Sequence, residues 1–221
     1  MTGVDVWHKP FRVNERLFEQ SLSADEKEKA SKFFKEEDSQ RYKSAHIFLR
    51  AVLTHYFPSV KKEAWSFETN AYGKPFIAKV HEISFHFNLS HSASHIYIVC
   101  THEKECGIDV EEIKEIELSP ELLNLVMSKE EQEDFALSHE KEELFFRYWT
   151  AKEAYVKAIG KGISLALSNV EFKELEIKPR AFEIEGDFFY SKLIEENYYL
   201  CLVILQSDKD NNMKFYKEEN L

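Results

Sequence analysis

The chain has 221 residues, a net charge of −11 and 43% hydrophobic residues, among them 18 Phe. This length fits one large domain or two domains of roughly 110 residues each, and the apolar content excludes a globally disordered chain. The negative charge argues against nucleic-acid binding, because a phosphate polyanion needs a basic surface. Any anionic substrate must therefore meet a local cluster of Lys, Arg and His.

The elements predicted for the first part follow from periodicity and capping signals. Ser23 precedes Glu26 by three residues, which is the spacing of a helix-starting capping box. Apolar and polar residues alternate over 83–88, before the polar stretch 90–94, and a β-rich apolar run follows over 95–101, which predicts a hairpin. The predicted elements are a strand over 3–7, helices over about 24–34 and 37–56, and strands over about 83–88, 95–101 and 106–111.

The second part repeats this order of helices followed by strands. Pro120 behind Ser119 marks a helix start, and Gly160 marks a helix end. The predicted elements are helices over about 120–127, 129–137 and 141–159, and strands over 182–184, 188–194 and 198–205; the tail from Ser207 is polar and weakly specified. We place the boundary between residues 1–112 and 113–221.

This weak internal repeat predicts an α+β pseudo-dimer of two similar halves, with a cleft between them. A chain that carries both halves is expected to be a monomer. The cysteines, Cys100, Cys106 and Cys201, lack the spacing of a disulfide or zinc framework. We expect a cytoplasmic protein, because we find no signal peptide and no apolar stretch of the roughly 18 to 20 residues that a membrane span needs.

Two carboxylates stand out on the strand that begins at Cys106. Asp109 and Glu111 are two residues apart, so they share one face of the strand. Like charges at this spacing repel unless a cation lies between them. Mg²⁺ is a hard ion that prefers oxygen ligands and often meets substrate phosphates. The alternative is a solvated end of an edge strand.

The long helix over 141–159 carries a second group of candidates. Its apolar stripe is formed by Leu144, Tyr148, Ala151, Tyr155 and Ala158. A helical wheel places Trp149, Lys152, Glu153 and Lys157 away from that stripe. Glu153 and Lys157 are four residues apart, which also fits a surface ion pair. The other interpretation packs Trp149 between the halves, adds Glu153 to the metal site and frees both lysines for phosphate oxygens.

The predicted hairpin carries Ser90 and His91. Adjacent strand residues point to opposite faces, so the two are not a hydrolase pair. A cationic His91 with nearby hydroxyls can hold a terminal phosphate. A turn histidine without a role is the alternative.

Together these segments resemble the Sfp-type 4′-phosphopantetheinyl transferases. The matching stretches, in order, are Tyr72-Gly73-Lys74-Pro75, Phe87 to Ser92, Gly107 to Glu111, Trp149 to Lys157, and Gly160-Lys161-Gly162. The resemblance implies two α/β-sandwich-like halves with the active site between them. It also implies transfer of the phosphopantetheine arm of coenzyme A to a serine of an apo acyl or peptidyl carrier protein, with release of adenosine 3′,5′-bisphosphate.

The resemblance also assigns roles to individual residues. It implies Mg²⁺ ligands at Asp109, Glu111 and Glu153, catalytic roles for Glu153 as a base and Lys157 on the pyrophosphate, and coenzyme contacts at Lys29, Arg41, Gly73, Lys74, Pro75, Ser90, His91, Lys152 and Lys157. Glu131 matches an acidic position near the active site. Glu26 departs from the family pattern, which often has Lys there, so one coenzyme-binding charge is missing.

Two other functions remain open on the sequence. One is a degenerate pseudo-dimer that binds coenzyme A or carrier proteins without transfer, against which the intact carboxylates argue. The other is a Mg²⁺-dependent nucleotide phosphotransferase, although the sequence has no Walker-type glycine-rich loop.

Overall fold

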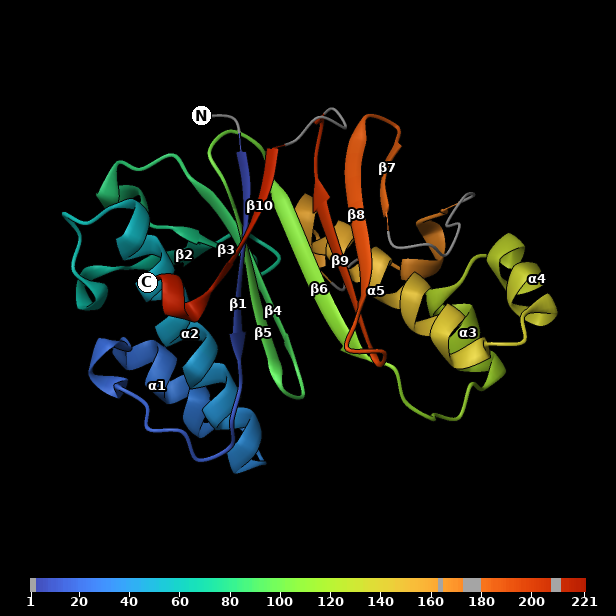
Figure 1. Cartoon of the computed structure of the whole chain (residues 1–221), viewed down its shortest axis with the longest axis horizontal. Helices are drawn as coiled ribbons and strands as arrows, with labels where there is room; N and C mark the ends of the chain where they lie inside the picture. The colour runs from blue at the N-terminus through green and yellow to red at the C-terminus, as the bar shows by residue number, and fades with distance from the viewer. Residues whose placement is uncertain (1–2, 163–164, 173–179, 208–211) are drawn as a thin grey trace.

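The computed structural model of the chain describes residues 3–162, 165–172, 180–207 and 212–221. Two four-stranded sheets lie face to face in the middle of the molecule, and helices cover their outer faces (Figure 1). One apolar core lies between the sheets, and each sheet shares a second core with its own helices. Within the described ranges, none of the helices combines the length and apolarity that crossing a bilayer requires.

Each half begins with a strand, continues with helices and ends with strands. The first contains β1 (Gly3–Pro10), α1 (Ala24–Ser31), α2 (Glu36–Tyr56), β2 (Phe67–Thr69), β3 (Pro75–Ile77), β4 (His86–Ser92) and β5 (His95–Thr101). The second contains β6 (Cys106–Glu112), α3 (Pro120–Val126), α4 (Lys129–Leu137), α5 (Lys141–Ile159), β7 (Arg180–Ile184), β8 (Asp187–Ile194) and β9 (Tyr198–Ile204). The strand orders β1-β5-β4 and β6-β9-β8 correspond, which confirms the predicted α+β pseudo-dimer.

Local sequence signals account for several helix ends. Ser23 and Glu26 form the predicted capping box at the start of α1, and Ser128 and Glu131 form another at the start of α4. At the end of α5, Gly160 adopts the left-handed conformation at φ 68° that favours glycine.

The sheets divide the chain differently from the predicted boundary after residue 112. β6 precedes that boundary, yet it pairs with β9 in the second sheet. The tail predicted to be weakly specified forms β10 (Asn212–Lys217), which runs parallel to β1 beside it (Figure 1). The hydrophobic pattern of β10 is weak because most of its side chains are exposed. Tyr216 is one that packs inward, and its ring stacks on that of Trp7 with centroids 4.6 Å apart.

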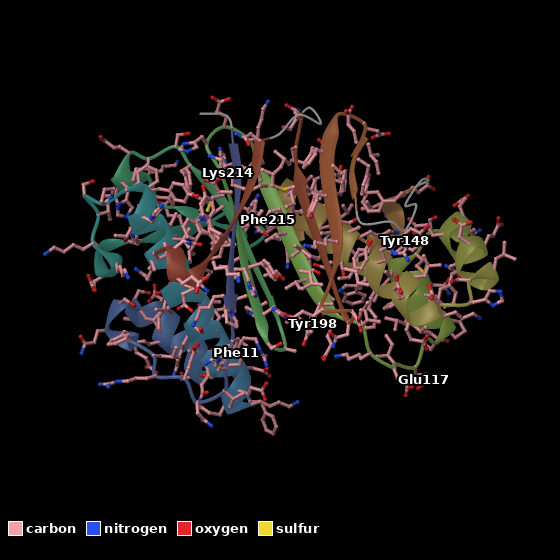
Figure 2. All side chains as sticks on the ribbon, viewed as in Figure 1. Phe11, Glu117, Tyr148, Tyr198, Lys214 and Phe215 are labelled. Atoms are coloured by element: carbon pink, nitrogen blue, oxygen red, sulfur yellow. The ribbon has the colours of Figure 1, made fainter. Side chains whose placement is uncertain are left out.

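The space between the halves is filled by side chains from both sheets (Figure 2). Tyr198, labelled near the centre of that view, contacts the ring of His95 across the halves. Phe215 of β10 packs against Tyr190 of β8 with ring centroids 5.7 Å apart. The two halves therefore share the core that lies between their sheets.

Polar side chains of β4 bond the backbone of β6 where the sheets meet. Each strand lies at the end of its sheet, so one row of its backbone groups lacks a neighbouring strand. Three β4 side-chain oxygens accept hydrogen bonds from β6 N–H groups: Asn88 from Ile108 at 2.9 Å, Ser90 from Val110 at 3.4 Å and Ser92 from Glu112 at 3.2 Å. We call these three pairs the β4–β6 seam. The seam satisfies buried donors and sets the register between the halves.

Gly107 of β6 allows α5 to lie close to the strand. A Cβ at this position would lie 2.0 Å from the carbonyl oxygen of Ala154 and 2.4 Å from the backbone nitrogen of Ala158. Since both contacts are backbone atoms of α5, a side chain at 107 forces the helix away from the strand.

We predict that Gly107→Ala lowers the free energy of unfolding by about 1–3 kcal/mol or more, because overpacking moves α5. Gly3→Ala is the matched control, since a Cβ there would meet only the carbonyl oxygen of Asn212, at 3.5 Å. Urea unfolding of both variants measures the difference. Equal midpoints for the two variants would contradict the proposed contact.

Candidate functional site

Asp109 is the most deeply buried of the predicted site carboxylates, with 3% of its surface exposed. Its Oδ1 accepts hydrogen bonds from the hydroxyl of Ser90 at 2.8 Å and from the ammonium of Lys157 at 2.5 Å. Its Oδ2 is buried and has no hydrogen-bond partner. A buried carboxylate is costly unless its charge is compensated, so Lys157 offsets this cost on one oxygen and leaves the other open.

The negative charge of Asp109 affects the pKa values of Glu111 and Glu153. Burial, together with the Asp109 carboxylate, raises the pKa of Glu111 to about 7. Burial also raises the pKa of Glu153, again with a contribution from Asp109. The structure therefore brings together carboxylates from β6 and α5 that repel one another.

These residues fit a hard divalent cation in their donor chemistry. They offer carboxylate oxygens alone, including the unpartnered Oδ2 of Asp109, which are the ligands that Mg²⁺ prefers. In the described ranges, however, no three acidic, His or Cys side chains already surround a metal-sized gap. Lys157 holds the other oxygen of Asp109 in this state.

Beside this cluster lies a cavity of about 1000 Å³. Its walls come from α1, α2, the turn between β2 and β3, β4 and the C-terminal end of α5. Seven predicted site residues line it: Lys29, Gly73, Lys74, Pro75, His91, Glu153 and Lys157. Lys157 joins the cavity to the carboxylate cluster, because it lines the one and binds the other.

His91 lines the cavity as an uncharged group. Burial and, to a smaller extent, the charges of Lys157 and Arg41 lower its pKa to about 4. This lowered pKa differs from the expectation of a cationic His91, and its main cause is burial. A bound anion would favour the protonated form. The Arg41 guanidinium donates to Asp38 at 2.7 Å and to the carbonyl of Ala93 at 3.0 Å, behind the cavity lining.

The ammonium of Lys74 bonds to protein groups. It donates to the carboxylate of Glu105 at 2.6 Å and to the carbonyl oxygens of Ala158 at 2.8 Å and Cys106 at 3.2 Å. Ser90 is bonded to Asp109 and stands in the β4–β6 seam rather than in the cavity lining. These two residues therefore make contacts between the two halves.

Lys152 does not share the face of Glu153 and Lys157, so the helical-wheel prediction is wrong for it. Its side chain is completely buried, and its ammonium donates to Glu131 and to the carbonyl of Val126. Burial lowers the pKa of Lys152, against the opposing effect of Glu131. The wheel fails because α5 is covered on two sides, by its sheet and by α3 and α4. Lys152 is thus unavailable to a phosphate, and Glu131 is its partner.

Trp149 is also placed differently from the interface prediction. It packs on the core of the second half, with its ring centroid 5.8 Å from that of Phe145.

We predict that Glu131→Ala lowers the free energy of unfolding by about 3–5 kcal/mol, because it leaves the buried ammonium of Lys152 unpaired. The exposed neighbour Glu133→Ala is the control, and urea unfolding is the measurement. The double variant Glu131→Ala, Lys152→Met should recover part of the loss. A Glu131→Ala protein as stable as the control would show that the pair has no structural role.

Glu26, the departure from the family pattern, is buried and lines the cavity. Burial by itself raises its pKa, but hydrogen bonds from His46 and the Ser23 backbone, together with the charge of Arg50, hold the pKa at about 2. Glu26 therefore acts as an anchor between α1 and α2. Its charge is taken up by protein partners, since Arg50 donates to it at 2.7 Å.

Because the pKa of Glu26 is lowered from 4.5 to about 2 in the folded protein, its charge stabilises the fold above pH 4.5. That contribution is lost as the pH falls toward 2. We predict that Glu26→Gln unfolds more easily than wild type by roughly 3 kcal/mol at pH 7. Urea unfolding at pH 7, 5 and 3 should show the gap shrinking only at the lowest pH, whereas Asp25→Asn, at an exposed neighbour, shows little gap. A constant gap contradicts the assignment.

The sequence interpretation missed the polar face that α2 presents to the cavity. Tyr42, His46 and Arg50 line it together. They are spaced four residues apart, which places them on one face of a helix. The sequence did contain a signal for this face, because His46 and Arg50 follow Tyr42 at the four-residue spacing of the helix face that packs on the core.

Comparisons with known proteins agree with this geometry. A family model described as the 4′-phosphopantetheinyl transferase superfamily matches residues 105–203, and one described as 4′-phosphopantetheinyl transferase, N-terminal, matches residues 7–103. The two matches meet just before β6, where the two sheets divide.

Curated relatives are similar over much of the chain. The 4′-phosphopantetheinyl transferase Sfp of Bacillus subtilis (strain 168) is 34% identical over 71% of this chain and 67% of its own length. A second 4′-phosphopantetheinyl transferase of Bacillus subtilis is 30% identical over 90% of this chain and 89% of its own length. The transferase psf-1 of Bacillus pumilus is 35% identical over 60% of this chain, and the match spans 55% of that protein.

Proposed function

Because this chain belongs to the 4′-phosphopantetheinyl transferase superfamily and is an enzyme of that class, we propose its reaction in detail. It transfers the 4′-phosphopantetheine arm of coenzyme A to a serine of an apo acyl or peptidyl carrier protein, and adenosine 3′,5′-bisphosphate is the second product. The observation that carries this proposal is Lys157, which lines the cavity and binds the carboxylate of Asp109. One chain supplies both walls of the site, so the active form is a monomer.

In this reaction the serine oxygen attacks the β-phosphorus of coenzyme A. A new P–O bond to serine forms, the bond from the β-phosphorus to the bridging oxygen breaks, and the leaving α-phosphate keeps the electron pair. Asp109, Glu111 and Glu153 would hold Mg²⁺, which would supply positive charge to the pyrophosphate. Positioning and charge neutralisation dominate such transfers.

Glu153 is suited to accept the serine proton. Burial and Asp109 raise its pKa, which brings the carboxylate closer to the neutral range where a base works best. It lines the cavity on α5, one turn before Lys157. A ligand role for the same carboxylate is also compatible with its place beside Asp109.

The cationic groups face the coenzyme from both halves. Lys157 forms an ion pair with Asp109, and the pyrophosphate would compete for its ammonium. Lys29 also lines the cavity and lies over the ring of Tyr42, 5.3 Å from its centroid. His91, backed by Arg41, faces the 3′-phosphate, and the backbone of Gly73 to Pro75 lines the nucleotide end. These local charges let an acidic protein bind a polyanion.

We predict that Glu153→Ala lowers transfer at least about 10²- to 10⁴-fold, the usual contribution of a positioned acid–base group, and that Asp109→Ala nearly abolishes transfer because it removes a proposed Mg²⁺ ligand. Mass spectrometry of an apo carrier protein mixed with enzyme, coenzyme A and Mg²⁺ detects the gain of one phosphopantetheine. Glu115→Ala, at an exposed carboxylate beyond β6, is the control and should retain full transfer.

Both variants should remain folded, which urea unfolding would show. Near-normal transfer by either one would refute the site assignment. Coenzyme A binding by the wild type without any transfer would instead support the non-enzymatic alternative.

A further inference from the structure

The end of α5 is bonded by side chains from the other half of the chain. The turn between β2 and β3, residues 70–74, approaches Gly160 so closely that a Cβ there would lie 2.8 Å from Nδ2 of Asn70. Likewise, a Cβ on Gly162 would lie 3.1 Å from the carbonyl oxygen of Tyr72. Two separate segments of the sequence, around Gly73 and around Gly160, are therefore in contact.

Asn70 makes the bonds that join these segments. Its Oδ1 accepts from the backbone N–H groups of Tyr72 at 2.9 Å and Lys74 at 3.0 Å, which shapes the turn. Its Nδ2 donates to the carbonyl oxygen of Gly160 at 2.7 Å, 90 residues further along the chain. The one amide thus uses both of its ends.

The bonded groups are the carbonyls that a helix end leaves without partners. Asn70 bonds that of Gly160, and the ammonium of Lys74 bonds that of Ala158. A cation and an N–H donor at this position also suit the negative end of the helix dipole. Lys157 lies in the same last turn of α5, next to Ala158.

We propose that Asn70 is a positioning residue: it caps α5 from the other half and thereby holds Lys157 at the cavity wall for the pyrophosphate of coenzyme A. This inference rests on the proposed function. It gives Asn70 two separable tasks, since the oxygen shapes the turn and the nitrogen holds the helix.

Asn70→Asp separates the two tasks. The carboxylate keeps the acceptor for the turn, loses the donor, and places negative charge against the carbonyl of Gly160 and the end of the helix dipole. We expect coenzyme A to bind about 10-fold more weakly, which is the effect of one orphaned hydrogen-bonding group. The KM for coenzyme A should rise while the KM for the carrier protein stays constant. Asn70→Ala should weaken binding to a similar extent, and the exposed Asn124→Asp should not.

Calorimetric titration with coenzyme A and Mg²⁺ is the test, on protein that urea unfolding shows to be folded. The weakening caused by Asn70→Asp should largely vanish in a Lys157→Met background, since Asn70 acts through Lys157. Wild-type binding by Asn70→Asp, with weak binding by Asn70→Ala alone, would reduce Asn70 to a turn residue and overturn the inference. An equal effect in both backgrounds would also overturn it. A wild-type protein that fails to bind coenzyme A would instead refute the proposed function itself.

Discussion

The β4–β6 seam is the contact on which the rest of the structure depends. Two strands at the ends of their sheets meet there, and the free N–H groups of β6 find acceptors in side chains rather than in a neighbouring strand. Leaving such donors buried and unpaired costs free energy. The seam therefore specifies one register between the halves. In that register Ser90 lies beside Asp109, and the turn between β2 and β3 reaches the end of α5.

The electrostatics of the site follow from this close approach. Burial makes negative charge expensive at Glu111 and Glu153, and Asp109 makes it more expensive still. Lys157 relieves Asp109 in the ligand-free state. Because the carboxylates repel one another, the site favours cation binding. The ammonium of Lys157 both pairs with Asp109 and lines the cavity, so it links the carboxylates to an anionic substrate. Local arrangement outweighs the overall charge of the protein.

The positions of some residues could be predicted from the sequence alone, and those of others could not. Ser23 with Glu26 and Gly160 specified helix ends because capping depends on residues close in the chain. Alternation placed Asp109 and Glu111 on one face of a strand. Lys152 was misplaced because a helical wheel cannot show that α4 covers a second side of α5. His91 was expected to be charged because sequence does not show how deeply a side chain is buried.

The sequence by itself determined the two helix-and-sheet halves, the helix ends and the identity of the acidic and basic candidates. These depend on local periodicity and on capping. Only the tertiary structure decided that Lys152 pairs with Glu131 and that Asn70 bonds Gly160 in the other half. It also decided that β6 pairs with β9 and that β10 pairs with β1. Each of these features depends on contacts between residues far apart in the chain. The stability of such contacts depends on how deeply the groups are buried, and a local sequence pattern does not show that burial.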